Sequence, residues 1–410
     1  MKEVFLERVL ARAEKSGLAC QFTLVQEKVL SLRLANSQVI QPAATESFFA
    51  HVTLEKEGCA ASSHLTGSPD WAVEAAWQKA LASLSQGPKL DPLPLAPAVR
   101  QIELASAPMP EIGEFTAFAE TLASSPGRSG MLQVRERQVA VVNSQGLLRT
   151  SRRQLAHFFF SQNGFFELAA PSFWELQNLP LVVRPAPDKI KELSPGSCRV
   201  LLGPRAVADL VEGIACTGFG GREYLERKSF LHKTRTVGKE NFTITDDWQL
   251  TAGLPFDFQG TSRSRLPLVE RGEAKRPVTD LDLAARLGTG STGHALPPWE
   301  GGGALPLNLV LASGDEEDVF AALGEGLYLP RFHYLGLVDP ATATFTGTIR
   351  DAAWVEGGRL VGKVSPARFT ISFLALADRI EVLGKKRWLV PGDWGSHLVP
   401  ELVADGFNIE

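Results

Sequence analysis

The apolar positions at the start of the chain repeat every three or four residues, and soon afterwards they repeat every second residue. The first pattern predicts a helix that stops before Gly17 and buries the stripe formed by Leu6, Val9, Leu10 and Ala13. The second predicts strands at residues 19–25, 29–34 and 47–55, the last with one buried face. His51 falls on the more polar side of that strand, where we expect a structural role.

A second helix is marked at both of its ends. Ser68 is placed to cap it, Pro69 suits the first helical position, and Gly87-Pro88 ends it. Its apolar stripe contains Val73, Ala76, Trp77, Ala80, Leu81 and Leu84. Helices alternating with strands in this way predict an N-terminal α+β domain over residues 1–90, with the helices packed on a sheet.

Prolines and hairpin turns dominate the next segment. Residues 88–110 hold six prolines and little periodicity, which predicts a linker or an extended crossing segment. Asn143-Ser144-Gln145-Gly146 and Asn163-Gly164 each separate two strand-like stretches, as hairpin turns do. We therefore interpret residues 91–187 as a linker followed by an antiparallel β-meander.

Short strands separated by Gly, Pro and Asp turns fill most of the remaining chain. One helix begins at Pro204 and is expected to end before Gly218, and another is expected at about residues 316–323. The pattern predicts a β-rich domain over residues 188–410. The predicted fold class is thus α+β.

Composition and charge narrow the classes of function. The chain has 410 residues, of which 44% are hydrophobic and 21% charged, and its net charge is −4. This balance gives no basic surface for nucleic acid or an anionic membrane, and no apolar run is long enough to span a bilayer. The four cysteines form no C-x-x-C motif, so we expect buried, reduced thiols and a cytoplasmic protein.

No local metal motif is present in the sequence. A zinc-binding helix needs two histidines about one turn apart, whereas the closest pair here, His51 and His64, is 13 positions apart. A dispersed metal site that gathers His232, His294 and His333 remains an alternative.

Motifs for nucleophilic catalysis and phosphate binding are also missing. There is no G-x-S-x-G, and the glycines of residues 218–221 follow a helix instead of a strand. The glycine-rich loop 288–293 lacks the lysine of a P-loop, but its backbone could approach a ligand or another chain closely. Asp246, Asp247 and Asp257 form a cluster that could bind a cation or transfer protons, or simply cap turns.

Several segments resemble the TldD/PmbA family in order and spacing. The resemblance covers residues 20 to 400. Its main segments are Val142–Leu147, Leu202–Leu210, Lys228–Leu231, Thr243–Asp247, Pro255–Gly260, Leu283–Gly288, Ser291–His294, Pro306–Leu309 and Gly326–Leu329. Two positions depart from the family pattern, because Gln259 stands for a usual glutamate and His294 for a usual asparagine.

The resemblance implies an N-terminal α+β part and a C-terminal domain with a curved, barrel-like sheet. In the catalytic type, TldD, a helix carries H-E-x-x-x-H and a later cysteine completes the metal site. The corresponding region here, about residues 205–216, has no histidine, and no cysteine follows Cys216. The chain is therefore similar to the PmbA/TldE type, with no cofactor of its own and zinc expected in a TldD-like partner.

This resemblance also implies a role and a set of candidate contacts. The expected role is a non-catalytic subunit that encloses a cavity with its metal-bearing partner and holds unfolded peptide, with a homodimer possible when the chain is alone. Some family members carry the name modulator of DNA gyrase, but we expect no nucleic-acid partner here. The candidate substrate contacts are Ser229, Asp246, Asp247, Ser291, Thr292, Gly293 and His294. The alternatives are a self-sufficient hydrolase with a dispersed site and a non-enzymatic interaction protein.

Overall fold

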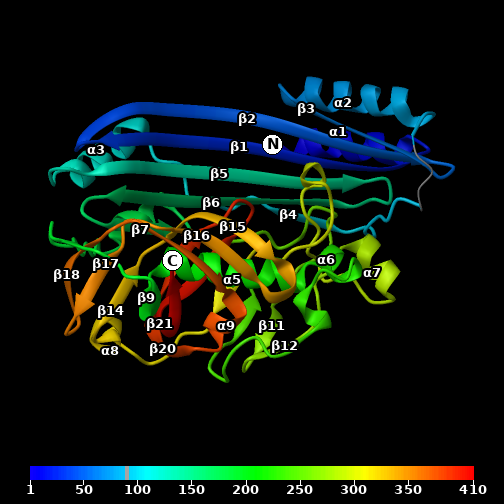
Figure 1. The fold of residues 1–410 in the computed structure, drawn as a ribbon. Coiled ribbons are helices and arrows are strands. Elements are labelled where there is room, and N and C mark those ends of the chain that lie inside the picture. Colours follow the sequence, from blue (N-terminus) through cyan, green and yellow to red (C-terminus); the bar gives the residue numbers. More distant parts are fainter. Residues whose placement is uncertain (88–91) are drawn as a thin grey trace.

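The computed structural model describes residues 1–87 and 92–410. The predicted α+β class is confirmed, with helices packed on open, curved sheets (Figure 1). The strands of the described residues do not close into a barrel. Within these same residues, every helix is too short or too polar to cross a membrane.

The first sheet has seven strands in the order β3-β2-β1-β5-β6-β4, and β7 also pairs with β6. The two predicted strands at residues 19–25 and 29–34 are one long strand, and both predicted hairpins are present. The strands are β1 (Ala19–Ala35), β2 (Gln38–Lys56), β3 (Cys59–Thr66), β4 (Arg100–Glu103), β5 (Ser129–Asn143), β6 (Leu148–Ser161) and β7 (Phe165–Ala170).

Even-numbered and odd-numbered residues of β1, β5 and β6 face opposite sides of this sheet. Even-numbered apolar residues such as Phe22 and Phe158 pack against helices at the two ends of the sheet. Those helices are α1 (Glu3–Lys15), α2 (Pro69–Leu84), α3 (Ile112–Ala123) and α4 (Phe173–Asn178). Odd-numbered residues such as Val139 and Val141 meet Phe258 of the C-terminal part. The sheet is therefore covered on both faces.

The C-terminal part contains an 11-stranded sheet and a three-stranded sheet. The order of the larger sheet is β12-β11-β10-β13-β21-β9-β14-β17-β18-β8, with β20 paired to β21. Its strands are β8 (Ile190–Lys191), β9 (Gly196–Leu202), β10 (Ile244–Asp246), β11 (Leu266–Glu270), β12 (Glu273–Ala274), β13 (Leu309–Leu311), β14 (Gly326–Leu329), β17 (Ala353–Glu356), β18 (Arg359–Val364), β20 (Ile380–Pro391) and β21 (Ser396–Ile409). The smaller sheet contains β15 (Phe332–Asp339), β16 (Thr344–Ile349) and β19 (Ala367–Ser372).

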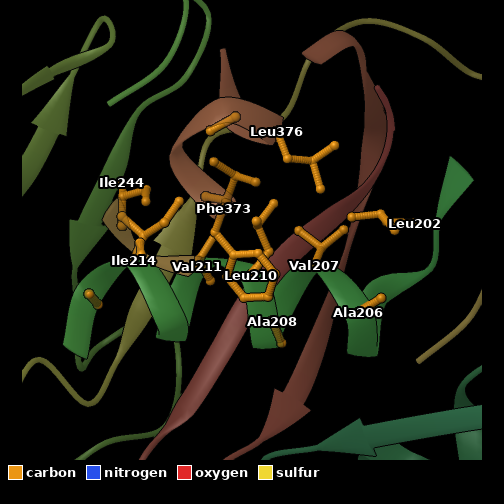
Figure 2. Close-up of a cluster of buried hydrophobic side chains, with 14 of the residues drawn as sticks. Leu202, Ala206, Val207, Ala208, Leu210, Val211, Ile214, Ile244, Phe373 and Leu376 are labelled. Carbon is orange, nitrogen blue, oxygen red and sulfur yellow. The ribbon is translucent and has the colours of Figure 1, made fainter. Parts of the chain in front are cut away.

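Helix α5 (Pro204–Phe219) lies at the centre of the C-terminal core. It begins at Pro204 as predicted, because proline lacks the N–H that the first helical position leaves unpaired. Figure 2 shows Phe373 and Leu376 lying over the apolar side of this helix, which includes Leu210. The remaining helices are short: α6 (Gly221–Leu225), α7 (Leu281–Leu287), α8 (Val319–Leu323), α9 (Phe373–Ala377), and the 3-10 turns η1 (Phe230–His232), η2 (Pro298–Glu300) and η3 (Pro340–Thr342).

Four helix predictions need correction. The side chain of Ser68, the N-cap residue of α2, makes no capping hydrogen bond, and Leu81 of that helix is 42% exposed instead of buried.

The other two corrections concern the C-terminal part. Gly218 lies inside α5, which continues to Phe219. A Cβ at Gly218 would stand 2.2 Å from the ring of Phe230, so this glycine permits close packing and does not stop the helix. The helix expected at residues 316–323 is shorter and begins at Val319, because the side chain of Asp318 caps it.

His51 is also placed differently from the prediction. Its side chain is buried, since Trp299 from the C-terminal part covers this side of β2. Burial and the neighbouring His64 lower the pKa of His51 to about 4, so its ring is neutral at pH 7. Of the four cysteines, all are free thiols, but Cys20 alone is fully buried.

The division at residues 90 and 187 remains a proposal. Residue 90 and Pro88 lie outside the described residues. The segments on either side of residue 90 share one sheet, because β1 pairs with both β2 and β5.

We expect Gly213→Ala to destabilise the protein. Alanine in place of glycine inside a helix ordinarily stabilises by about 0.5–1 kcal/mol. At this position, however, the new Cβ would lie 2.7 Å from Cδ2 of Phe373 and 3.0 Å from Cε2 of Phe345. Overpacking of this kind costs about 1–3 kcal/mol, so the free energy of unfolding, measured in urea, should fall.

Gly113→Ala in α3 is the matched control, because a Cβ there meets no heavy atom within 4 Å. This variant should keep or slightly raise the free energy of unfolding. An unchanged stability of Gly213→Ala would contradict the close packing of α5 against α9.

Candidate functional site

Asp246, at the end of β10, is the centre of a buried polar network. One carboxylate oxygen accepts hydrogen bonds from the backbone N–H groups of Leu307 and Asn308, both at 2.9 Å. The other pairs with the guanidinium of Arg263 at 2.7 Å, and Arg263 also donates to the Asn308 side chain at 2.6 Å. Burial alone would raise the pKa of Asp246, but Arg263 and His294 hold it well below its ordinary value.

His294 is the second member of this network, and its ring is also buried. Nδ1 lies 2.8 Å from the carbonyl oxygen of Thr292, which can only accept, so Nδ1 carries a proton. Nε2 lies 3.4 Å from a carboxylate oxygen of Asp246. This second contact is an ion pair only when the ring binds another proton.

The loop that carries Ser291, Thr292 and Gly293 is fixed to the segment before α7. Ser291 and Thr292 donate their hydroxyl groups to the carbonyl oxygen of Thr279, and the N–H of Thr279 donates to the Thr292 hydroxyl at 2.7 Å. Gly293 has a φ of +74°, and a Cβ there would lie 2.5 Å from a backbone oxygen of Ser262. The close approach at Gly293 is therefore to the chain itself, whereas a Cβ at Gly288 or Gly290 would meet no heavy atom within 4 Å.

The two remaining predicted contacts have local roles. The Ser229 hydroxyl donates to the Gly218 carbonyl at 2.6 Å and accepts from the N–H of Leu231, which joins α5 to η1. The Asp247 side chain accepts from the N–H of Gln249 at 3.1 Å. The structure thus brings Asp246 and His294 into one buried network, whereas Ser229 lies apart from it in the contact between α5 and η1. With Ser229, Asp246 and His294 buried, contact with a peptide would require this region to open.

The histidines of the alternative metal site have separate partners. His232 lies against Tyr224, with Nε2 at 2.7 Å from its carbonyl oxygen, and His333 pairs with Asp351 at 3.2 Å. Within residues 1–87 and 92–410, the structure brings no three His, Cys, Asp or Glu side chains into a metal-binding group.

A second polar region lies between the first sheet and α5, and we call it the intersheet cleft. Its volume is about 300 Å³. Odd-numbered residues of β5 and β6 form one wall, and α5 with the β20–β21 turn forms the other. The polar and charged residues that line it are Gln133, Arg135, His157, Arg205, Glu212 and Asp393.

Glu167 of β7 connects the walls of the cleft. It forms a two-point ion pair with Arg205 at 2.6 and 2.9 Å and accepts from His157 at 2.7 Å. Burial would raise the pKa of Glu167, but Arg205 and His157 lower it to about 2. Arg205 also donates to the Pro391 carbonyl at 2.9 Å, so one arginine holds the first sheet, α5 and β20 together.

Two further acids of α5 lie near Arg205. His397 lowers the pKa of Glu212, whose carboxylate is 3.5 Å from Nε2 of that ring. Asp209 differs, because burial raises its pKa to about 7 despite the charge of Arg205. Glu212 is therefore an anion whose half-exposed oxygens can accept N–H groups of a ligand.

The sequence predictions missed the intersheet cleft. Its residues lie on long strands and on a helix, whereas the segments singled out by their sequence motifs are mostly loops. The signal that could have found it is the odd-numbered position of both Arg135 and His157, which puts them on one face of neighbouring strands, but the predicted strands included only His157.

Comparisons with known proteins agree with this architecture. Residues 195–410 match the family described as PmbA/TldA metallopeptidase C-terminal domain. No curated protein sequence matches the chain. The crystal structure of TldE from Thermococcus kodakarensis is similar over 99% of both chains, with a TM-score of 0.81 and 14% identity.

Two crystal structures of proposed DNA gyrase modulators are also similar. The one from Thermotoga maritima is 19% identical with a TM-score of 0.75 over 100% of both chains. The one from Bacteroides thetaiotaomicron is 15% identical with a TM-score of 0.75, over 100% of this chain and 98% of the other. At these identities, the structural likeness shows a shared fold.

Replacing Asp246 by asparagine should strongly destabilise the fold. The change leaves the guanidinium of Arg263 buried without its counter-charge, which typically costs about 3–5 kcal/mol. Asp247→Asn is the matched neighbour, because the amide oxygen can still accept from Gln249, and we expect a loss below about 1 kcal/mol. Urea unfolding at pH 7 measures both, and equal losses would contradict the assigned roles.

Asp209→Asn should change how stability depends on pH. With its pKa raised from 3.8 to about 7, the folded state holds a proton that the unfolded state has released between these values. Asp209 should therefore contribute a fall in stability as pH rises from about 4 to 7, and the variant should lack this contribution, so the two pH profiles should diverge over this range. At pH 8 we expect the variant to be more stable by about 1–2 kcal/mol, allowing for solvent screening. Parallel pH profiles in urea unfolding would refute this assignment.

Proposed function

Because the chain belongs to the PmbA/TldD family, we propose that it is the subunit without a metal site in a heterodimeric metallopeptidase that processes unfolded peptides. The partner is the family member that carries H-E-x-x-x-H, and zinc belongs to that subunit. This chain would complete the peptide-binding cavity and help to hold the substrate.

The observation that carries the proposal is the composition of α5. A zinc-binding helix needs histidines about one turn apart, whereas α5 has Arg205, Asp209 and Glu212 at these spacings and no histidine. Arg205 is engaged by Glu167, so this surface of the helix is filled by a cation and its counter-ion. The full-length likeness to a protein named TldE supports the same role.

Main-chain recognition is the binding mode that suits a substrate of variable sequence. β7 pairs with β6 along one edge, and no strand of residues 1–87 or 92–410 pairs with its other edge. An extended peptide can add to such an edge through backbone hydrogen bonds that do not depend on side chains. Glu212, in the cleft beside it, offers a further acceptor for peptide N–H groups.

Co-expression with the histidine-bearing family member tests this function. We expect a one-to-one complex by native mass spectrometry, with stoichiometric zinc and cleavage of an unfolded, fluorescence-quenched peptide. The isolated chain should bind no stoichiometric zinc and cleave nothing. Changing the glutamate of the partner's H-E-x-x-x-H to glutamine should abolish cleavage but leave the complex intact, since that residue takes a proton from metal-bound water.

The His232→Ala and His333→Ala variants of this chain are the controls. Neither should change the zinc content or the activity of the complex, because His232 contacts Tyr224 and His333 contacts Asp351 within this chain. Zinc and turnover in the isolated chain, lost in these variants, would instead establish the self-sufficient hydrolase. A chain that never binds the histidine-bearing member would favour a separate interaction protein.

A further inference from the structure

A pocket lies where β7, the start of α5 and β20 meet, and we call it the β7–β20 pocket. It is separate from the intersheet cleft, although Arg205 contributes to the walls of both. Its volume is about 150 Å³. A cavity of about this size holds a benzene-sized group, which matches one aromatic or branched aliphatic side chain.

The deeper walls of the pocket are aromatic and held in place by neighbours. Phe166 stacks on Phe160 with ring centroids 5.0 Å apart, and Tyr328 packs on Phe320 at 5.1 Å. Trp388 forms another wall, and the ammonium of Lys386 lies 3.7 Å from its ring centroid. Walls that are fixed before binding lose little conformational entropy when a ligand enters.

The charges around the pocket disfavour a cationic ligand. Its lining has three acids and three bases, so their formal charges cancel. Glu167 is paired with Arg205, and Glu401 is paired with Arg184 at 3.1 Å. Glu317 is paired with Lys385, whereas Lys386 lies over the Trp388 ring and forms no ion pair with a described residue. A cationic group entering here would therefore lose its hydration without finding a free counter-ion.

One polar group in the pocket remains available to a ligand. The phenol hydroxyl of Tyr328 has no hydrogen-bond partner among the described residues, and burial raises the pKa of this phenol, so it stays protonated. It can donate to a peptide carbonyl or accept from a peptide N–H. The rim is open at Val182, whose side chain is 47% exposed.

We infer that the β7–β20 pocket binds one bulky, uncharged apolar side chain of an extended peptide, with the Tyr328 hydroxyl bonded to the adjacent main chain. The inference rests on the proposed function, because peptide is the substrate class named there. It adds a side-chain preference to a subunit that supplies no catalytic metal. Residues 165–168 of β7, whose second edge pairs with no strand of the described residues, line the same pocket, so side-chain and main-chain contacts can be made together.

Peptide binding by the isolated full chain tests this inference. The probes are acetyl-Gly-Phe-Gly-amide and acetyl-Gly-Ala-Gly-amide, titrated by NMR. Burial of the phenyl ring should make the first bind at least about tenfold more tightly. Tyr328→Phe should weaken both peptides by about three- to tenfold and leave their ratio unchanged. Equal affinities for the two peptides would overturn the inference.

Val182→Trp should fill the rim of the pocket and reduce the affinity for the phenylalanine peptide to that of the alanine peptide. Leu179→Trp is the matched control, since Leu179 is 39% exposed on the same segment but does not line the pocket. Protection of Lys386 from acetylation by the phenylalanine peptide gives a readout that needs no variant. Undiminished binding by Val182→Trp, or no protection of Lys386, would place the peptide elsewhere.

These measurements need no partner subunit, so they separate the two proposals. If the isolated chain discriminates between the two peptides but co-expression with the histidine-bearing family member yields no zinc-bearing complex, the pocket is supported and the proposed function is refuted. An active complex whose isolated subunit shows no discrimination would refute the pocket alone.

Discussion

The burial of both faces of the first sheet is the constraint on which the rest of the structure depends. Because side chains alternate along a strand, each residue of β5 and β6 belongs either to the helix-covered core or to the side that meets the C-terminal part. Val134 and Phe158 lie in the first group, and Arg135 and His157 in the second. A shift of one residue in the pairing would bury the arginines under helices and put apolar rings in the cleft. The register that makes the core therefore also makes the cleft.

Arg205 connects that sheet to the C-terminal core. Its guanidinium is bonded to Glu167 of β7 and to the Pro391 carbonyl, while the neighbouring face of α5 is buried among apolar residues. A buried ion pair contributes little net stability, because desolvation offsets the attraction, but its geometry is specific. We infer that this contact fixes the position of α5 against β7 and thereby shapes both the cleft and the pocket.

The sequence predicted those features that depend on neighbouring residues. Proline at the start of α5 and the turn at Asn163-Gly164 act locally, so the helix start and the hairpin could be recognised. The burial of His51 depends on Trp299, which is distant in sequence, and could not be read from an alternating pattern. Gly218 resembles a helix stop until the ring of Phe230 is seen against it.

The candidate site shows the same division. Asp246 and His294 were both selected from the sequence, but nothing local indicated that they would share a buried network with Arg263. Their burial comes from the folding of distant segments over β10. The intersheet cleft was missed for a related reason, because its wall residues are scattered over two strands and a helix. Alternation could have put Arg135 and His157 on one face, but only the structure puts α5 opposite them.

Charge neutralisation gives the cleft and the pocket a common character. The buried Glu167 is balanced by Arg205, and the formal charges of the three acids and three bases that line the β7–β20 pocket sum to zero. A surface of this kind attracts charged molecules weakly, yet its oxygens and hydroxyls can still bond to a peptide backbone. Since peptide groups are neutral and present in every sequence, this surface suits the retention of varied chains. Selectivity then has to come from apolar burial, which is the contribution that the aromatic walls of the pocket can supply.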